Sequence, residues 1–213
     1  MADNGGTMTE LLLIRHGETD WNRRQCFQGQ IDVPLNERGL AQAARLGAHL
    51  ADERLDGLVV SDLTRTRQTA APLAEALGLS PRYTPALREQ AFGILEGMTF
   101  DEIRVKHPAE FALWARQEPD YALPGGAESR RLFHQRVIGA LSELAQAHAG
   151  QRLAVVTHGG VLDMVWRSAK GLPLLGPREC AIPNTGINRV HVREGRFEIL
   201  GWAEDRHVRD LLS

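Results

Sequence analysis

The sequence has little cysteine, no long hydrophobic run and no excess of charge of either sign. Only 2 cysteines occur among 213 residues, too few for a disulfide-stabilised scaffold, so we expect Cys26 and Cys180 to be free thiols. The 25 basic and 27 acidic residues give a formal net charge of −2. This balance argues against a broad electrostatic surface for nucleic acid or for an anionic membrane. Any phosphate group that the protein binds must therefore be bound locally.

The sequence also lacks a recognisable targeting or membrane-spanning segment. Met1 to Glu10 is polar and has neither the basic nor the apolar region of a signal peptide. Apolar runs such as Leu11 to Ile14 are far shorter than the roughly 20 residues that cross a bilayer. We therefore expect a cytoplasmic protein, and its length predicts one domain over residues 1–213.

Three short apolar runs, each followed by polar residues, predict buried strands of a mostly parallel sheet. They are Leu11 to Ile14, Leu58 to Val60 and Leu153 to Val156. Helical patterns are expected at residues 36–50, 64–77 and 128–149, a further strand at 82–86, and a hairpin formed by 187–192 and 197–202. Alternating strands and helices predict an α/β fold with layered helices and sheet.

Residues 92–127 have a different composition from the rest of the chain. Pro108, Pro119, Pro124 and the Gly125-Gly126 pair interrupt weak helical patterns that are rich in Trp and Phe. We interpret this segment as a small helical cap inserted over the edge of the sheet. Its aromatic residues Phe111 and Trp114 could form a specificity wall, but a local hydrophobic core is the favoured interpretation.

Two of the predicted strands are followed by a His-Gly pair. The first run leads into Arg15-His16-Gly17, and the late run leads into His158-Gly159-Gly160. Ligands of parallel α/β sheets bind beyond the carboxyl ends of the strands. If these two strands are neighbours, His16 and His158 face one another there, and the glycines let backbone amides approach a ligand closely.

Arg65 is expected at the same rim, in the first turn of the helix that follows the middle run. A cation is disfavoured at a helix N-terminus, and a bound anion would relieve the conflict. Together with Arg15 and the two histidines, Arg65 predicts a phosphate site. The mechanism these residues support is in-line attack by a neutral imidazole, with the equatorial oxygens held by Arg15, Arg65 and a second, protonated or hydrogen-bond-donating imidazole. Glu89 is the candidate proton donor to the leaving group.

The chain resembles the histidine phosphatase superfamily, the phosphoglycerate-mutase-like proteins. The resemblance rests on blocks that occur in the family's order and cover most of the chain: Leu13-Ile-Arg-His-Gly-Glu-Thr-Asp-Trp-Asn22, Gln28-Gly29, Asp32-Val-Pro-Leu35, Ser61-Asp-Leu-Thr-Arg-Thr-Arg-Gln-Thr-Ala70, Glu89 with Phe92-Gly93, and Val156-Thr-His-Gly-Gly160. It implies a three-layer α/β/α sandwich. It further implies that His16 is the nucleophile that becomes phosphohistidine, and that Glu89 acts first as acid and then as base.

The same resemblance implies the remaining site residues. Arg15, Arg65 and His158 would form the phosphate pocket, Asn22, Gln28, Gly29 and Gly159 would line it, and no metal or other cofactor is implied. The other histidines lack metal-ligand spacing such as His-Glu-x-x-His, which agrees with that expectation.

Two departures from the family's pattern fall in the cap. Leu95 stands where many relatives have Trp, and Ala127 interrupts a Gly-Glu-Ser block. The cofactor-dependent mutases have His-Tyr-Gly soon after the acid, whereas Glu89 is followed here by Gln-Ala-Phe-Gly93. We therefore predict a metal-independent phosphatase acting on a small phosphorylated metabolite. The alternatives are a phosphoglycerate mutase, which would need 2,3-bisphosphoglycerate, and a non-catalytic phosphate-binding module. A homodimer through the C-terminal hairpin is possible on this sequence.

Overall fold

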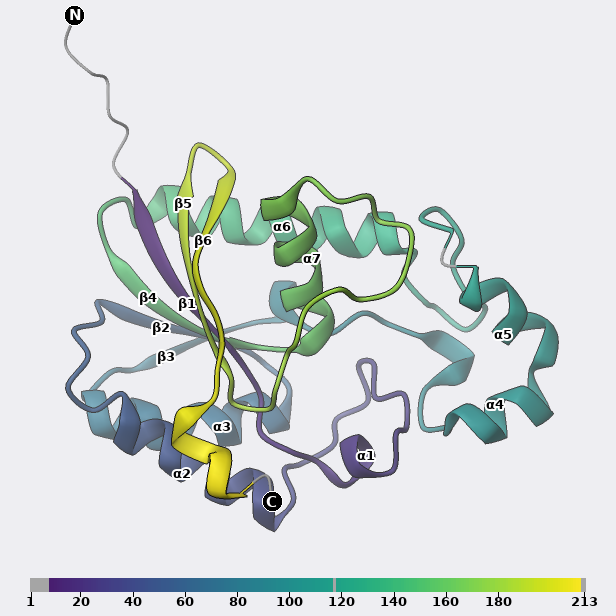
Figure 1. Ribbon diagram of the computed structural model, residues 1–213, viewed down its shortest axis with the longest axis horizontal. Helices are drawn as coiled ribbons and strands as arrows, with labels where there is room; N and C mark the ends of the chain where they lie inside the picture. Colours follow the sequence, from purple (N-terminus) through teal and green to yellow (C-terminus); the bar gives the residue numbers. More distant parts are fainter. Residues whose placement is uncertain (1–7, 117, 212–213) are drawn as a thin grey trace, which may run out of the picture.

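The computed structural model describes residues 8–116 and 118–211 and contains a six-stranded sheet in the order β3-β2-β4-β1-β5-β6 (Figure 1). Residues 1–7, which carry much of the prediction of location, lie outside the described part. The strands are β1 (Thr9–Arg15), β2 (Gly57–Ser61), β3 (Pro81–Thr84), β4 (Arg152–Thr157), β5 (Ile187–Arg193) and β6 (Arg196–Glu204). The α-helices are α1 (Asp20–Arg23), α2 (Glu37–His49), α3 (Thr64–Leu77), α4 (Phe100–Lys106), α5 (Pro108–Ala115), α6 (Arg130–Ala147) and α7 (Gly159–Lys170). Short 3₁₀ turns are η1 (Pro85–Leu87), η2 (Gly93–Leu95) and η3 (Arg206–Leu211).

Strands β1 to β4 are parallel to one another, β5 pairs antiparallel with β1, and β6 pairs antiparallel with β5. The prediction of a mostly parallel sheet is therefore confirmed. In the register of β1 and β4, Arg15 pairs with Thr157. The residues that follow these strands, His16 and His158, consequently start from the same level of the rim.

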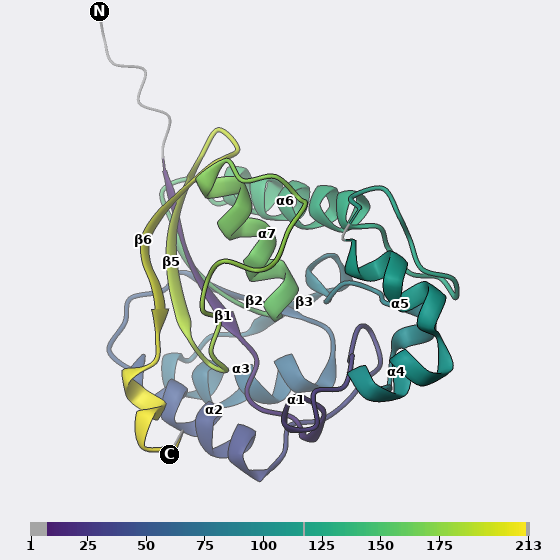
Figure 2. The same ribbon diagram turned by 45° about the vertical axis from the view of Figure 1, so that its right-hand side comes forward.

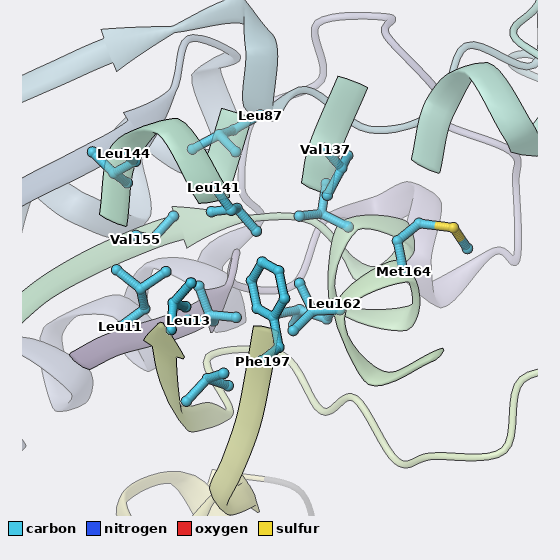
Figure 3. Close-up of a cluster of buried hydrophobic side chains, with 14 of the residues drawn as sticks. Leu11, Leu13, Leu87, Val137, Leu141, Leu144, Val155, Leu162, Met164 and Phe197 are labelled. Atoms are coloured by element: carbon cyan, nitrogen blue, oxygen red, sulfur yellow. The ribbon is translucent and has the colours of Figure 1, made fainter. Parts of the chain in front are cut away.

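Helices cover both faces of the sheet, which makes the three-layer arrangement. Side chains alternate along β1: Leu11 and Leu13 belong to a core with α6 and α7, whereas Leu12 and Ile14 belong to a core with α2 and α3. Figure 3 shows the first of these cores, where Phe197 packs among side chains from the strands and from α6 and α7. Because β1, β2 and β4 contribute side chains to both cores, each of these strands contains a continuous apolar run.

Most helix boundaries follow capping rules read from the sequence. The Asn36 side chain accepts a hydrogen bond from the Gly39 N–H at the start of α2, and Ser129 accepts one from Leu132 at the start of α6. Helix α7 was not anticipated, because it opens with two glycines and its N-cap, His158, makes no capping hydrogen bond from its side chain. Strand β3 ends before the predicted residue 86, since Pro85 opens the turn η1.

The cap segment, defined here as residues 92–127, contributes α4 and α5, which lie beyond the carboxyl ends of the parallel strands (Figures 1 and 2). A capping box between Thr99 and Glu102 begins α4. Phe111 and Trp114 of α5 pack against a small core that includes Phe27, and the Phe27 and Trp114 rings meet edge to face at 5.1 Å between centroids. In the part of the chain that the structure describes, no helix is long and apolar enough to span a bilayer.

Candidate active site

A cavity of about 480 Å³ opens at the carboxyl end of β1. Its lining includes these residues that the sequence singled out: Arg15, His16, Asn22, Gln28, Gly29, Arg65 and Glu89. His158 and Gly159 do not line this cavity but lie next to residues that do. The His16 and His158 rings are 5.3 Å apart between centroids, and Arg15 Nε is 3.5 Å from the position of a Cβ on Gly159. The predicted site residues are thus brought together from the end of β1, from α1 and the loop after it, from α3, from the turn after η1 and from the junction of β4 and α7.

His16 is held as a neutral imidazole with one nitrogen free to act. Its Nδ1 lies 2.7 Å from the Gly17 carbonyl oxygen, and because a carbonyl only accepts, Nδ1 carries the proton. The lone pair is then on Nε2. Burial lowers the pKa of His16 well below its usual range, and the Arg65 and Arg15 charges lower it further. Neutral Nε2 is the state that a nucleophile requires.

The backbone around His16 is fixed by hydrogen bonds. The His16 N–H donates to the Thr157 carbonyl at 2.9 Å, and Asn184 Nδ2 donates to the His16 carbonyl at 2.8 Å. The Gly17 N–H donates to Thr69 Oγ1 at 2.9 Å. A Cβ on Gly17 would lie 2.7 Å from a carbonyl oxygen of α2, so only glycine fits there.

His158 is fully buried and bonded on both sides. Its Nδ1 accepts from Arg65 Nε at 3.2 Å, so its Nε2 carries the proton and donates to Ser61 Oγ at 2.8 Å. Burial, followed by the Arg65 charge, lowers the pKa of His158 well below its usual range. Since both ring nitrogens have protein partners here, direct contact between His158 and a phosphate stays a prediction.

Arg65 lies in the first turn of α3, where the sequence placed it, and is fully buried. Its Nη1 donates to a backbone carbonyl at 2.9 Å and its Nη2 donates to the Gly29 carbonyl at 2.8 Å. Burial lowers the pKa of Arg65 to about 10. Part of the expected conflict with the helix dipole is relieved within the protein, because Asp32 accepts the Thr64 N–H at 2.6 Å and supplies a negative charge at the helix start.

Arg15 carries the clearest indication of an anion. Its Nη1 donates to the Ile182 carbonyl at 2.6 Å, but its Nε is buried and has no hydrogen-bond partner in the described part of the chain. Burial, then the Arg178 charge, lowers the pKa of Arg15 to about 10. A buried donor without a partner costs free energy, and a bound phosphate oxygen would satisfy it.

Glu89 faces the same cavity and is oriented by backbone groups. Its carboxylate oxygens accept from the Gln90 N–H at 2.8 Å and from the Gly160 N–H at 2.9 Å. A Cβ on Gly160 would overlap Glu89 Oε1, so the glycine makes room for the carboxylate at the start of α7. The backbone carbonyl of Glu89 accepts a hydrogen bond from Arg136 Nη2 at 3.2 Å.

Three of the four predicted lining residues border this cavity, namely Asn22, Gln28 and Gly29. Asn22 Oδ1 accepts the Thr19 N–H at 3.1 Å in the capping box of α1. Gln28 Oε1 is buried without a hydrogen-bond partner. Gly29 has a φ of 51°, and a Cβ there would overlap the Glu96 side chain.

A second cavity of about 390 Å³ adjoins the first beneath the cap segment. Glu89, Phe92, Phe100 and Arg178 line both cavities. Arg178, which lies in the irregular loop between α7 and β5, was missed in the sequence because no period, cap or strand end marks it. Ser61 and Asn184 were also missed as supports of the histidines, although Ser61 ends β2 and the strand-end rule covers it.

Within residues 8–116 and 118–211, no group of three or more His, Cys, Asp or Glu side chains could hold a metal ion.

The model of the "Histidine phosphatase superfamily (branch 1)" matches residues 11–205. The chain belongs to the histidine phosphatase superfamily. The family and the fold predicted from the sequence are therefore confirmed.

Among curated relatives of this histidine phosphatase family member, one from Arabidopsis thaliana named "Metal-independent phosphoserine phosphatase" is 35% identical over 204 residues, which are 94% of this chain and 84% of the relative. A second, "Phosphoglycerate mutase-like protein 4" of the same plant, is 32% identical over 94% of this chain and 87% of its own. The solved structure of Bacillus stearothermophilus YhfR superposes with a TM-score of 0.84 at 32% identity, covering 94% of this chain and 100% of that one.

Proposed function

We propose that the protein is a metal-independent phosphatase that hydrolyses a small phosphate monoester through a phosphohistidine on His16. The observation that carries this proposal is the neutral, buried His16, whose Nδ1–H is bonded to the Gly17 carbonyl and whose Nε2 is left as a nucleophile beside two arginines. Similarity to a relative whose name states metal independence supports the same chemistry.

In the first step, the lone pair on His16 Nε2 attacks phosphorus while the bond from phosphorus to the ester oxygen breaks. Arg15 and Arg65 hold the charge of the equatorial oxygens, and the buried Arg15 Nε gains its missing acceptor. Protonated Glu89 donates its proton to the departing alkoxide. In the second step, Glu89 takes a proton from water, the water oxygen bonds to phosphorus, and the P–N bond breaks to release inorganic phosphate.

We favour hydrolysis over the mutase reaction because Glu89 is followed by Gln-Ala-Phe rather than by the His-Tyr-Gly block that the mutases share. Arg130 and Arg131 are the adjacent pair nearest to the cap segment, and the structure turns them apart: Arg130 lines the second cavity, whereas Arg131 pairs with Asp120 at the surface. In the mutase alternative, 2,3-bisphosphoglycerate would be the cofactor.

The direct test is chemical trapping of the intermediate. Wild-type protein and the His16→Asn variant are mixed in EDTA with a ³²P-labelled monoester, quenched in alkali and resolved on a gel. We expect acid-labile, alkali-stable label on the wild type only, and a loss of several orders of magnitude in turnover for the variant. Near-normal hydrolysis by His16→Asn with a wild-type melting temperature would overturn the assignment.

A second measurement separates hydrolysis from isomerisation. With 3-phosphoglycerate, a trace of 2,3-bisphosphoglycerate and an aryl phosphate present together in EDTA, ³¹P NMR shows inorganic phosphate if the protein is a phosphatase. Rapid appearance of 2-phosphoglycerate would instead identify a mutase. Absence of both products, with phosphate ester still bound, would identify a binding module.

The proposal extends to the partner, the domain organisation and the compartment of the protein. The balanced charge of −2 supports a small phosphorylated metabolite as partner, and neither nucleic acid nor membrane. We propose a single domain, with residues 92–127 as its cap, in a cytoplasmic protein. Strand β6 is an edge strand, which leaves a homodimer through the β5–β6 hairpin open to test.

A further inference from the structure

Arg178 lies at the boundary between the two cavities and lines both. Its Nη2 and Nη1 atoms are 3.6 and 3.7 Å from the position that a Cβ on Gly159 would occupy, and Arg15 Nε is 3.5 Å from the same point. Helix α7 begins at Gly159. Two guanidinium groups therefore surround the positive end of a helix, an environment that favours an anion.

Among the residues that the structure describes, no hydrogen bond holds the Arg178 side chain. It is 45% exposed, and its Nε lies 4.0 Å from Asp163 Oδ1, beyond hydrogen-bond distance. That carboxylate oxygen is itself buried without a hydrogen-bond partner. Charge holds the two groups near each other, while the guanidinium donors of Arg178 stay available to a ligand in the cavity.

The loop that carries Arg178 is anchored by a different arginine. Arg167 is 1% exposed, and its Nη atoms donate to the carbonyl oxygens of Pro173, Leu175, Gly176 and Pro177. Its Nε donates to Asp163 Oδ2 at 3.1 Å. The backbone just before Arg178 is thus fixed, so an exposed side chain is presented from a rigid support.

Most other charges around the second cavity are already neutralised. Glu128 forms a two-bond pair with Arg136 at 2.6 and 2.7 Å. Asp163 accepts from Arg167 and lies 3.4 Å from Arg130 Nη2. Glu118 is exposed, where solvent and salt screen its charge. Arg178 is therefore the cation of this lining that is best placed to bind a ligand.

We propose that Arg178 is a specificity-determining residue that binds a carboxylate on the leaving group of the substrate. The inference rests on the proposed function, because the second cavity receives the leaving group only if phosphorus is bound beside His16. A single planar guanidinium suits a carboxylate, which it binds through two parallel hydrogen bonds. The preferred substrates are then phosphate monoesters of small hydroxy acids or hydroxyamino acids.

The test compares esters that differ in the carboxylate alone. One pair is O-phosphoserine and O-phosphoethanolamine, and the other is 3-phosphoglycerate and glycerol 3-phosphate. For wild type, kcat/KM is expected to be higher for the ester that carries a carboxylate, which is O-phosphoserine in the first pair and 3-phosphoglycerate in the second. In Arg178→Gln this preference should fall about 10- to 100-fold, mainly through KM, because a charge-assisted pair of hydrogen bonds is lost. Arg178→Lys should restore part of the preference.

Arg196→Gln is the matched control. Arg196 is exposed in the β5–β6 hairpin, at the amino end of β1 and so at the opposite end of the sheet from the cavities. The Arg196→Gln variant should show the same preference for carboxylate esters as wild type. An unchanged preference in Arg178→Gln would overturn the proposal. If kcat/KM fell equally for both members of each pair, the preference would also be unchanged, and the loss would place Arg178 on the phosphate instead.

Hydrolysis of 4-nitrophenyl phosphate in EDTA separates this proposal from the function on which it rests. If wild type hydrolyses the aryl ester through His16 but shows no preference for the carboxylate of either pair, or turns over neither pair, the Arg178 assignment fails and the phosphatase assignment stands. If wild type hydrolyses neither the aryl ester nor any of the four alkyl esters, the proposed function itself fails.

Discussion

The phosphate cavity and the cavity beneath the cap segment are built differently. Around the first, Arg65 and His158 are fully buried, and each makes several hydrogen bonds within the protein. Around the second, Phe100 and Trp114 are partly buried and meet ring to ring at 6.1 Å between centroids, without directional bonds. The contrast separates a part whose charged side chains are held in place by hydrogen bonds from a part whose wall on the side of the cap segment is formed by apolar ring contacts.

Glu89 is one of the residues at which the two parts meet, because it lines both cavities. Glu89→Gln removes the proton donor and keeps the shape of the side chain, although its one amide oxygen can accept from only one of the two backbone N–H groups, Gln90 or Gly160, that Glu89 binds. We expect turnover of an alkyl phosphate to fall about 10²- to 10⁴-fold. The first step with 4-nitrophenyl phosphate should fall far less, since that leaving group needs little protonation; burst kinetics measure it. Equal losses for both esters would contradict the assignment.

Arg65→Lys tests whether the phosphate cavity depends on fixed geometry or only on charge. Lysine keeps the positive charge but cannot donate at once to His158, the Gly29 carbonyl and the phosphate. We expect kcat/KM to fall about 10²-fold, by analogy with the loss of one preorganised donor. Arg67→Lys is the control, because Arg67 is two residues further along α3, is exposed and donates to the Asp62 carbonyl. A tenfold or smaller loss in Arg65→Lys would weaken the contrast between the cavities.

The buried, neutral histidines also make stability depend on pH. His16 has a folded-state pKa well below that of the unfolded chain, which is about 6.5. Its contribution is therefore complete above that value and is lost as the pH falls, because the unfolded chain takes up the proton first. Between pH 7.0 and 5.5, we expect His16→Asn to lose about 1 kcal/mol less unfolding free energy than wild type. Urea unfolding followed by tryptophan fluorescence measures both slopes, and parallel slopes would contradict the buried neutral state.

Trp114→Leu tests the apolar wall of the second cavity and should have the smallest effect on catalysis. It removes ring contacts with Phe27 and Phe111 but keeps an apolar side chain. We expect turnover of 4-nitrophenyl phosphate to change less than about threefold, while the ranking of alkyl esters shifts, because one reshaped apolar contact is worth roughly 1–3 kcal/mol in discrimination. A ranking identical to wild type across a panel of monoesters would show that the cap segment does not select the leaving group.

Some features could be predicted from local sequence because they depend on neighbouring residues. The apolar runs specify β1, β2 and β4, Asn36 and Ser129 specify the starts of α2 and α6, and the motifs specify the family. The unpredicted helix α7 has the opposite character. Its start is poor in local signals, and it is stabilised by burial of side chains such as Val161, Leu162 and Val165 in the core.

For the candidate site, the sequence determined which side chains follow strand ends, since that depends only on where apolar runs stop. The tertiary structure decided which of them meet. The placement of β4 directly beside β1 sets His16 against His158, and the route of the α7–β5 loop brings Arg178 to Arg15. These contacts join residues more than a hundred positions apart, and no local pattern encodes them because only the packing of the sheet and its helices closes such distances.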